Sequence, residues 1–75
     1  MKSTLVMDDT GGSVIVIEAS NGTTFYVDLS GVIGLEIGNG GAVVAHLPGG
    51  KIQILDLIRA DADRIAERWL ILRGS

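Results

Sequence analysis

Two stretches of the sequence repeat one plan, in which two short apolar runs flank a glycine-containing turn. Residues 14–18 and 25–29 flank Asn21-Gly22, and residues 42–46 and 52–57 flank Pro48-Gly49-Gly50. Asn-Gly between β-rich runs is the strongest short signal for a hairpin, and proline followed by glycine also favours a turn. The pattern therefore predicts two antiparallel hairpins. With only two copies, it does not indicate a solenoid.

The turn of the first hairpin sets the pairing of its strands. If Asn21 and Gly22 form a two-residue loop, Ile17 lies opposite Tyr26, because antiparallel partners step away from the turn in register. One face then carries Val14, Val16, Phe25, Val27 and Leu29, and the other carries Ile15, Ile17 and Tyr26 beside Thr24 and Asp28. We therefore expect both faces of this hairpin to be apolar.

The second hairpin and the segment between the hairpins show the alternation of half-buried strands. The second hairpin places Val43, Ala45, Leu47, Ile52 and Ile54 on one face, and Val44, His46, Gln53 and Leu55 on the other. Between the hairpins, Ile33, Leu35 and Ile37 alternate with Val32, Gly34 and Glu36. Residues 4–7 are a further strand candidate, so the sequence predicts five to six strands.

The hydrophobic period changes after Leu57. Apolar residues then recur at spacings of three and four, which is typical of one stripe on an α-helix: Ile58, Ala62, Ile65, Ala66, Trp69 and Leu72. Asp56 or Asp61 is positioned to cap this helix and Gly74 to end it. The sequence thus predicts an α+β fold in a single domain of residues 1–75. An antiparallel β-meander, open or curled into a small half-barrel, precedes one C-terminal α-helix of about 13 to 17 residues.

Covering both faces of such a sheet is difficult for a chain of 75 residues that has no cysteine and forms no disulfide. One helix, about 10–12 Å across, covers about one sheet face. We therefore expect a homodimer or higher homo-oligomer, with another protein as an alternative partner and a curved monomer as the alternative to association. The expected interface residues are Ile15, Ile17, Tyr26, Trp69, Leu70 and Ile71.

The sequence has no pattern typical of a catalytic or cofactor site. His46 is the only histidine, and in a strand it has no predictable nucleophile or orienting partner. Asp61 and Asp63 point away from each other on a helix, so they do not form a metal-binding pair. The glycine-rich loops at 38–41 and 48–51 precede strands, whereas phosphate-binding loops open a helix. We expect no enzyme activity, no metal and no cofactor.

Charge and hydropathy restrict the partners. Six basic and nine acidic residues give a net charge of −3, unlike a protein that binds nucleic acid by neutralising phosphates. No apolar run approaches the roughly 18 residues of a transmembrane helix, and residues 1–10 lack the apolar stretch of a signal peptide. We therefore expect a soluble, cytoplasmic protein without a membrane partner.

From Asp28 to Glu36 the sequence is DLSGVIGLE, set within the order strand, Asn-Gly turn, strand, strand, turn, strand, helix. This order resembles the first half of LytTR-type response-regulator domains, and a meander followed by a helix also resembles a shortened pleckstrin-homology-like domain. The basic DNA-contacting part of the former and the basic phosphoinositide-binding strands of the latter have no counterpart in the sequence. We therefore assign no family from these resemblances.

Three classes of function are compatible with the sequence. The first is a non-catalytic oligomeric interaction or structural module, which the apolar sheet faces favour. The second is a nucleic-acid-associated regulator that uses Arg59, Arg64, Arg68 and Arg73 of the helix. The third is a small-ligand-binding protein or enzyme with a pocket at a subunit interface near His46 and Tyr26.

Overall fold

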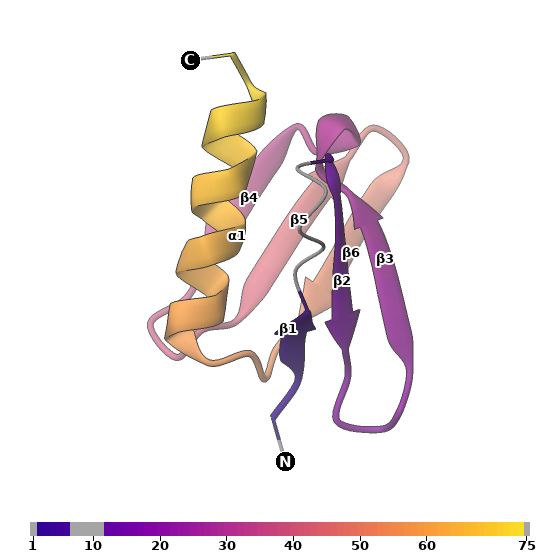
Figure 1. Cartoon of the computed structure of the whole chain (residues 1–75), viewed down its shortest axis with the longest axis vertical. Coiled ribbons are helices and arrows are strands. Elements are labelled where there is room, and N and C mark those ends of the chain that lie inside the picture. Colours follow the sequence, from indigo (N-terminus) through magenta and orange to yellow (C-terminus); the bar gives the residue numbers. More distant parts are fainter. Residues whose placement is uncertain (1, 7–11, 75) are drawn as a thin grey trace.

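The computed structural model describes residues 2–6 and 12–74, which form six strands and one α-helix (Figure 1). The strands are β1 (Thr4–Val6), β2 (Val14–Glu18), β3 (Thr24–Asp28), β4 (Gly34–Ile37), β5 (Val43–Leu47) and β6 (Gly50–Ile54). A short 3-10 helix, η1 (Leu29–Gly31), follows β3, and the α-helix is α1 (Arg59–Leu72). The predicted α+β class, a meander of strands before one C-terminal helix, is confirmed. The strand predicted at residues 4–7 is β1, and Met7 lies outside the described residues.

The strands form two antiparallel sheets of three, β1-β2-β3 and β4-β5-β6, and they do not close into a barrel. The inner faces of the sheets share one hydrophobic core, to which β2 contributes Ile15 and Ile17 and β5 contributes Val43 and Ala45. The helix α1 runs along one side of the sheets and adds Ile65 to this core (Figure 1). The sheets therefore cover each other's inner faces. For these faces no second subunit is needed, contrary to the expectation that one helix leaves a sheet face bare.

The loop of the first hairpin has three residues, Ser20 to Gly22, and not the two that the sequence suggested. Ala19 donates its N–H to the carbonyl of Thr23 at 2.7 Å, and Gly22 donates to the carbonyl of Ala19 at 3.0 Å. Only Gly22 has a positive φ, of +91°, whereas a two-residue type I′ turn would also need one at Asn21. Asn21 instead accepts the N–H of Thr23 on its side-chain oxygen at 3.0 Å.

The extra loop residue shifts the pairing of β3 by one position. Ile17 lies opposite Phe25 and Val16 opposite Tyr26, so the predicted faces of this hairpin are wrong. A shift by one residue moves every side chain of a strand to the other face of the sheet. As a result Val27 joins Ile17 in the core. In contrast, the second hairpin has the predicted faces, with Val43 opposite Ile54 and Ala45 opposite Ile52.

The helix α1 packs through the predicted stripe. Ala62 and Ile65 are buried, and Trp69 and Leu72 pack against the same core. The indole N–H of Trp69 donates to the carbonyl of Val32 at 3.0 Å, which fixes the second half of α1 near η1 and β4. The helix ends as predicted before Gly74, which has a φ of +90°. At the other end, Ile58 is the exposed N-cap, and no side chain caps the helix; the prediction that Asp56 or Asp61 does so is wrong.

The N-terminal strand joins the two sheets and the helix. Ser3 forms a parallel bridge with Leu57, and its N–H donates to the carbonyl of Asp56 at 3.2 Å. The Ser3 hydroxyl donates to the Asp56 carboxylate at 2.5 Å. Two residues later, the N–H of Leu5 donates to the carboxylate of Asp61 in the first turn of α1, at 3.2 Å. The N–H groups of β1 that do not face β2 thus have acceptors in the connection between β6 and α1 and in the helix itself.

The loop before β5 touches the start of α1 at Gly41. This residue is buried and has a φ of +95°, a conformation that side chains with a Cβ rarely adopt. A Cβ at this position would overlap the carbonyl oxygen of Leu57 and lie 2.9 Å from the backbone nitrogen of Arg59. Glycine at position 41 therefore allows the loop to pack directly on the backbone that leads into α1.

We predict that Gly41→Ala lowers the free energy of unfolding by at least about 2 kcal/mol, because it combines a strained φ with overlap of backbone atoms. Urea denaturation followed by circular dichroism measures this loss. Gly40→Ala is the matched control, since a Cβ there meets nothing within 4 Å. Equal stability of the two variants would contradict the close contact described above.

Candidate functional site

The outer faces of the two sheets differ in chemistry. On β4-β5-β6, Glu36 and His46 lie on the face away from the core. On β1-β2-β3, the pairing places Val6, Val16 and Tyr26 side by side across the three strands, because paired residues share a face. Val14 lies two residues before Val16 on the same face. We call Val6, Val14, Val16 and Tyr26 the valine–tyrosine face.

The valine–tyrosine face is open to solvent. Val6 is 42% exposed, Val14 is 44% exposed and Tyr26 is 72% exposed. Tyr26 is the most exposed large hydrophobic residue in the described part of the chain. Exposed apolar residues that adjoin one another, unlike scattered single ones, mark interaction surfaces. This face is therefore the strongest candidate for a functional site.

The rim of the valine–tyrosine face is acidic. Glu18 ends β2 and Asp28 ends β3, and the described strands β1, β2 and β3 contain no lysine or arginine. Asp28 accepts the hydroxyl of Ser30 at 2.7 Å and the N–H of Ser30 at 3.0 Å. The hydrogen bonds from Ser30 and from the Ser13 side chain lower the pKa of Asp28, so this carboxylate is ionised at neutral pH.

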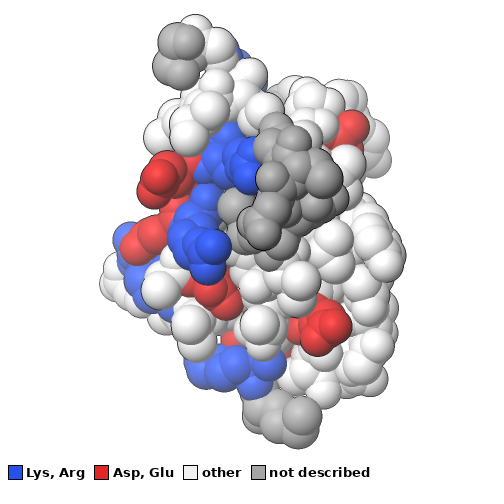
Figure 2. All heavy atoms as spheres, in the orientation of Figure 1, with Lys and Arg blue, Asp and Glu red and all other residues white. Residues whose placement is uncertain are grey.

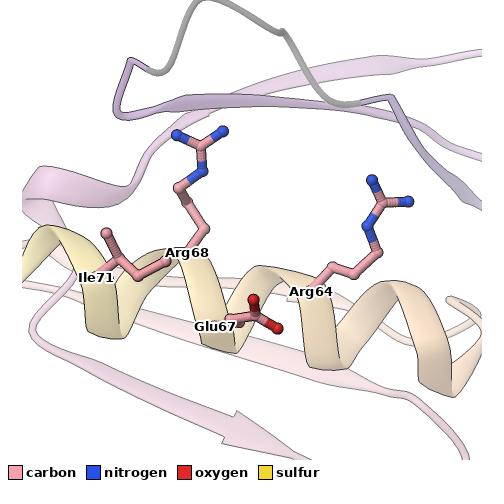
Figure 3. A pocket seen from close by; sticks show the side chains of 4 residues that line it. All are labelled: Arg64, Glu67, Arg68 and Ile71. Atoms are coloured by element: carbon pink, nitrogen blue, oxygen red, sulfur yellow. The ribbon is translucent and has the colours of Figure 1, made fainter.

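A second exposed feature is a hollow along α1 with a volume of about 340 Å³, which Figure 3 shows. Its lining residues in the described part of the chain are Arg64, Glu67, Arg68 and Ile71. Arg64 and Arg68 lie one helical turn apart, and their side chains extend the same way from α1 (Figure 3). Arg68 also donates to the carbonyl of Gly12 at 3.2 Å. We call this feature the α1 hollow.

Both features lie on one side of the molecule. Figure 2 shows basic and acidic side chains mixed along α1, and on the same side of the molecule a mostly uncharged surface over β2 and β3 with separate acidic groups. One side thus presents a helix surface of mixed charge and the valine–tyrosine face with its acidic rim.

The residues predicted to form an interface have different positions in the structure. Ile15 and Ile17 are 2% and 1% exposed in the core, so the prediction that they face outward is wrong; the shifted pairing of β3 and the second sheet both cover them. Trp69 is partly buried and bonded to Val32. Tyr26, Leu70 and Ile71 are exposed, and their role in an interface stays a prediction. The sequence prediction omitted Val6, Val14 and Val16, since only the true loop length reveals that they accompany Tyr26.

The candidate residues for chemistry have structural partners. The Nε2 atom of His46 lies 2.6 Å from a carboxylate oxygen of Glu36 on the outer face of the second sheet. Tyr26 belongs to the other sheet, so the structure does not bring His46 and Tyr26 together. Asp61 is buried and accepts the N–H of Leu5, whereas Asp63 pairs with Arg59 on the surface at 2.9 Å. Within residues 2–6 and 12–74, no three metal-ligating side chains lie together.

A cleft lies between the β2–β3 loop and the end of β6, with a volume of about 340 Å³. Ser3, Ser20, Phe25 and Asp56 are among its lining residues. Hydrogen bonds from the side chains of Ser3 and Ser20 lower the pKa of Asp56. The carboxylate of Asp56 therefore holds the chain at Ser3, just before β1, against the β6–α1 connection.

Comparisons of the chain with protein-family models, curated proteins and solved structures find no match. In the described part of the chain, no helix has the length and apolar character needed to cross a membrane.

We predict that Asp61→Ala lowers the free energy of unfolding by about 1–3 kcal/mol, because it leaves the buried N–H of Leu5 without an acceptor. Asp63→Ala, the matched control, changes it by less than about 0.5 kcal/mol, since it removes an exposed pair. Urea denaturation of both variants measures the difference. If Asp63→Ala is the more costly change, the role given to Asp61 is incorrect.

Acid should weaken the fold through Asp28 and Asp56. Both folded-state pKa values lie below the ordinary value of 3.8. The stabilisation from these groups is thus complete above 3.8 and is lost as the pH falls through the lowered folded-state pKa. We predict that the urea midpoint of the wild type falls between about pH 6 and about pH 2.5, and that Asp28→Asn/Asp56→Asn reduces this fall. An identical pH profile for the double variant would contradict the prediction.

Proposed function

We propose that the protein is a small non-catalytic interaction module that binds a second copy of itself through the side of the molecule that carries the valine–tyrosine face. The observation that carries the proposal is the row of Val6, Val16 and Tyr26 across β1-β2-β3, in which Val6 and Tyr26 are exposed and Val16 is half-buried. Transfer of such apolar surface from water to a protein interface is favourable, at about 25 cal/mol per Å². Tyrosine is also among the residues that contribute most to binding at interfaces.

Charge supports a second copy as the partner. The valine–tyrosine face has the acidic rim of Glu18 and Asp28, and the exposed side of α1 carries Arg64 and Arg68. One copy can therefore bring Arg64 and Arg68 of its helix against the acidic rim of another, and opposite charges across an interface favour association and orientation. Because both regions lie on one side of the molecule, a two-fold arrangement makes this contact twice.

The available surface is sufficient for a dimer. A stable interface buries about 800 Å² on each partner. The chain exposes 4534 Å² in total, so such an interface needs less than a fifth of its surface. Burial of further surface in a dimer matters for a chain of this size, because small domains bury a low fraction of their surface when they fold alone.

The contacts of the α1 arginines favour this proposal over a nucleic-acid-associated regulator. Arg59 pairs with Asp63, Arg68 bonds the carbonyl of Gly12, and Arg73 lies 5.1 Å from the ring centre of Trp69. The acidic side chains of Asp63 and Glu67 also lie among these arginines, so α1 does not present a continuous basic row for phosphates. The alternative of a ligand pocket near His46 and Tyr26 gains no support from residues on separate sheets.

We predict that the measured mass rises from that of a monomer towards that of a dimer as concentration increases, because association follows mass action. Light scattering over a dilution series measures this change. Val14→Ser/Tyr26→Ser should raise the dissociation constant by more than about tenfold, since it removes exposed apolar surface and the aromatic anchor.

The matched control is Ile33→Ser. Ile33 is 62% exposed but lies outside the valine–tyrosine face, so its replacement should leave the dissociation constant within about twofold of the wild type. A wild type that stays monomeric at every concentration refutes the proposed function. A dimer weakened equally by Ile33→Ser and by the double variant refutes the proposed location of the interface.

A further inference from the structure

The strand β3 has a free edge. It ends the order β1-β2-β3, and Figure 1 shows it on the side of the molecule opposite α1. Leu29 donates its N–H to the carbonyl of Ser13, just before β2, and backbone groups along an antiparallel strand point alternately towards its neighbour and away from it. The residues of β3 whose N–H and carbonyl groups point away from β2 are therefore Thr24, Tyr26 and Asp28. In the described part of the chain, these N–H groups have no acceptor.

The other edge strands are protected in ways that β3 is not. Proteins guard sheet edges by short strands, by lysine or proline, or by covering the edge with another element. The strand β1 has three residues, and the N–H of Leu5 donates to Asp61. The strand β4 follows Val32, which Trp69 of α1 contacts, and β6 carries Lys51. The strand β3 has five residues and contains no lysine, proline or glycine, so it can act as a template for another strand.

We propose that β3 pairs with β3 of a second copy, antiparallel, with Tyr26 of each copy opposite Tyr26 of the other. In this register Thr24 lies opposite Asp28 of the second copy, and each outward N–H of one β3 meets an outward carbonyl of the other. The sheets β1-β2-β3 of both copies then form one continuous antiparallel sheet. A two-fold axis between the two Tyr26 residues relates the copies, so the contact is isologous.

This register uses all the outward residues of β3 and keeps like charges apart. The hydroxyl of Thr24 can donate to the carboxylate of Asp28 on the facing strand. The two Asp28 residues lie four positions apart along the joined strands, at about 14 Å. A two-fold axis at Asp28 would instead place both carboxylates directly opposite each other, which is destabilising. The adjacent Tyr26 rings add an aromatic pair across the strands.

This contact goes beyond the proposed function, because it uses the backbone edge of β3 and does not cover the valine–tyrosine face. Backbone hydrogen bonds between copies replace bonds to water, so their net contribution to association is modest. We therefore expect pairing of β3 at higher protein concentration than the contact through the valine–tyrosine face. Where both contacts form, β3 joins dimers into larger assemblies.

The register can be tested with single-cysteine variants, because the chain has no cysteine of its own. Thr24→Cys and Asp28→Cys are mixed in equal amounts and oxidised. The Cα atoms of a hydrogen-bonded pair lie about 5.5 Å apart, which a disulfide can bridge. We expect at least about tenfold more mixed disulfide than disulfide between identical chains, since identical cysteines lie about 14 Å apart. Equal yields of the mixed disulfide and the disulfides between identical chains would overturn this register.

Amide hydrogen exchange, followed by NMR, tests the contact in the wild type. We expect the exchange of the Tyr26 amide to slow at least about tenfold between dilute and concentrated protein, because pairing gives this N–H an acceptor. The control is Gln53, whose N–H points outward from the edge of β6. Its exchange should not depend on concentration. Exchange at Tyr26 that is equally fast at all concentrations would refute the pairing of β3.

The outcomes separate this inference from the proposed function. Val14 lies on the valine–tyrosine face and outside β3, so Val14→Ser tests the face alone. If Val14→Ser weakens the dimer but neither the mixed disulfide nor the slower exchange is found, the proposed function stands and the pairing of β3 is refuted. If both signs of pairing are found and Val14→Ser leaves association unchanged, the pairing stands and the valine–tyrosine face is not an interface.

Discussion

The free edge of β1 is the constraint on which the arrangement of sheets and helix depends. Backbone N–H groups that leave water must find acceptors, and the outward N–H groups of Ser3 and Leu5 find them in the Asp56 carbonyl and the Asp61 carboxylate. Asp56 lies in the connection before α1, and Asp61 lies in the first turn of α1. One short strand therefore connects the first sheet, the end of the second sheet and the helix, over more than fifty positions in sequence.

This junction explains why a single helix is enough to complete the core. Because β1 holds the two sheets together at one edge, their inner faces pack on each other, and α1 needs to close only the remaining side. Trp69 fixes the far half of the helix to Val32, while Asp61 fixes its start. What stays exposed is the outer face of each sheet and one side of the helix. The proposed dimer is thus a consequence of surface chemistry and does not complete an unfinished core.

Much of the fold could be predicted from local patterns. Alternation in residues 43–54 gave the correct faces of the second hairpin, and spacings of three and four gave the buried side of α1. The first hairpin could not be predicted correctly, because Asn21-Gly22 is compatible with both a two-residue and a three-residue loop, and tertiary packing decides between them. The role of Asp61 was equally hidden, since nothing near it in sequence reveals its partner Leu5. Of the candidate site, only Tyr26, Ile71 and the helix arginines could be identified before the structure.

The three-residue loop between β2 and β3 restricts how the length of this loop can change. Side chains of a strand alternate between core and solvent, so removing or adding one residue at Ser20 exchanges the interior and exterior of β3, whereas a change of two preserves them. After a change of one residue, Phe25, which now faces the core, would face solvent, and Tyr26 would face the core. During evolution the residue types of this loop can therefore vary. Its length can change only by an even number of residues if the apolar side chains of β3 are to stay in the core.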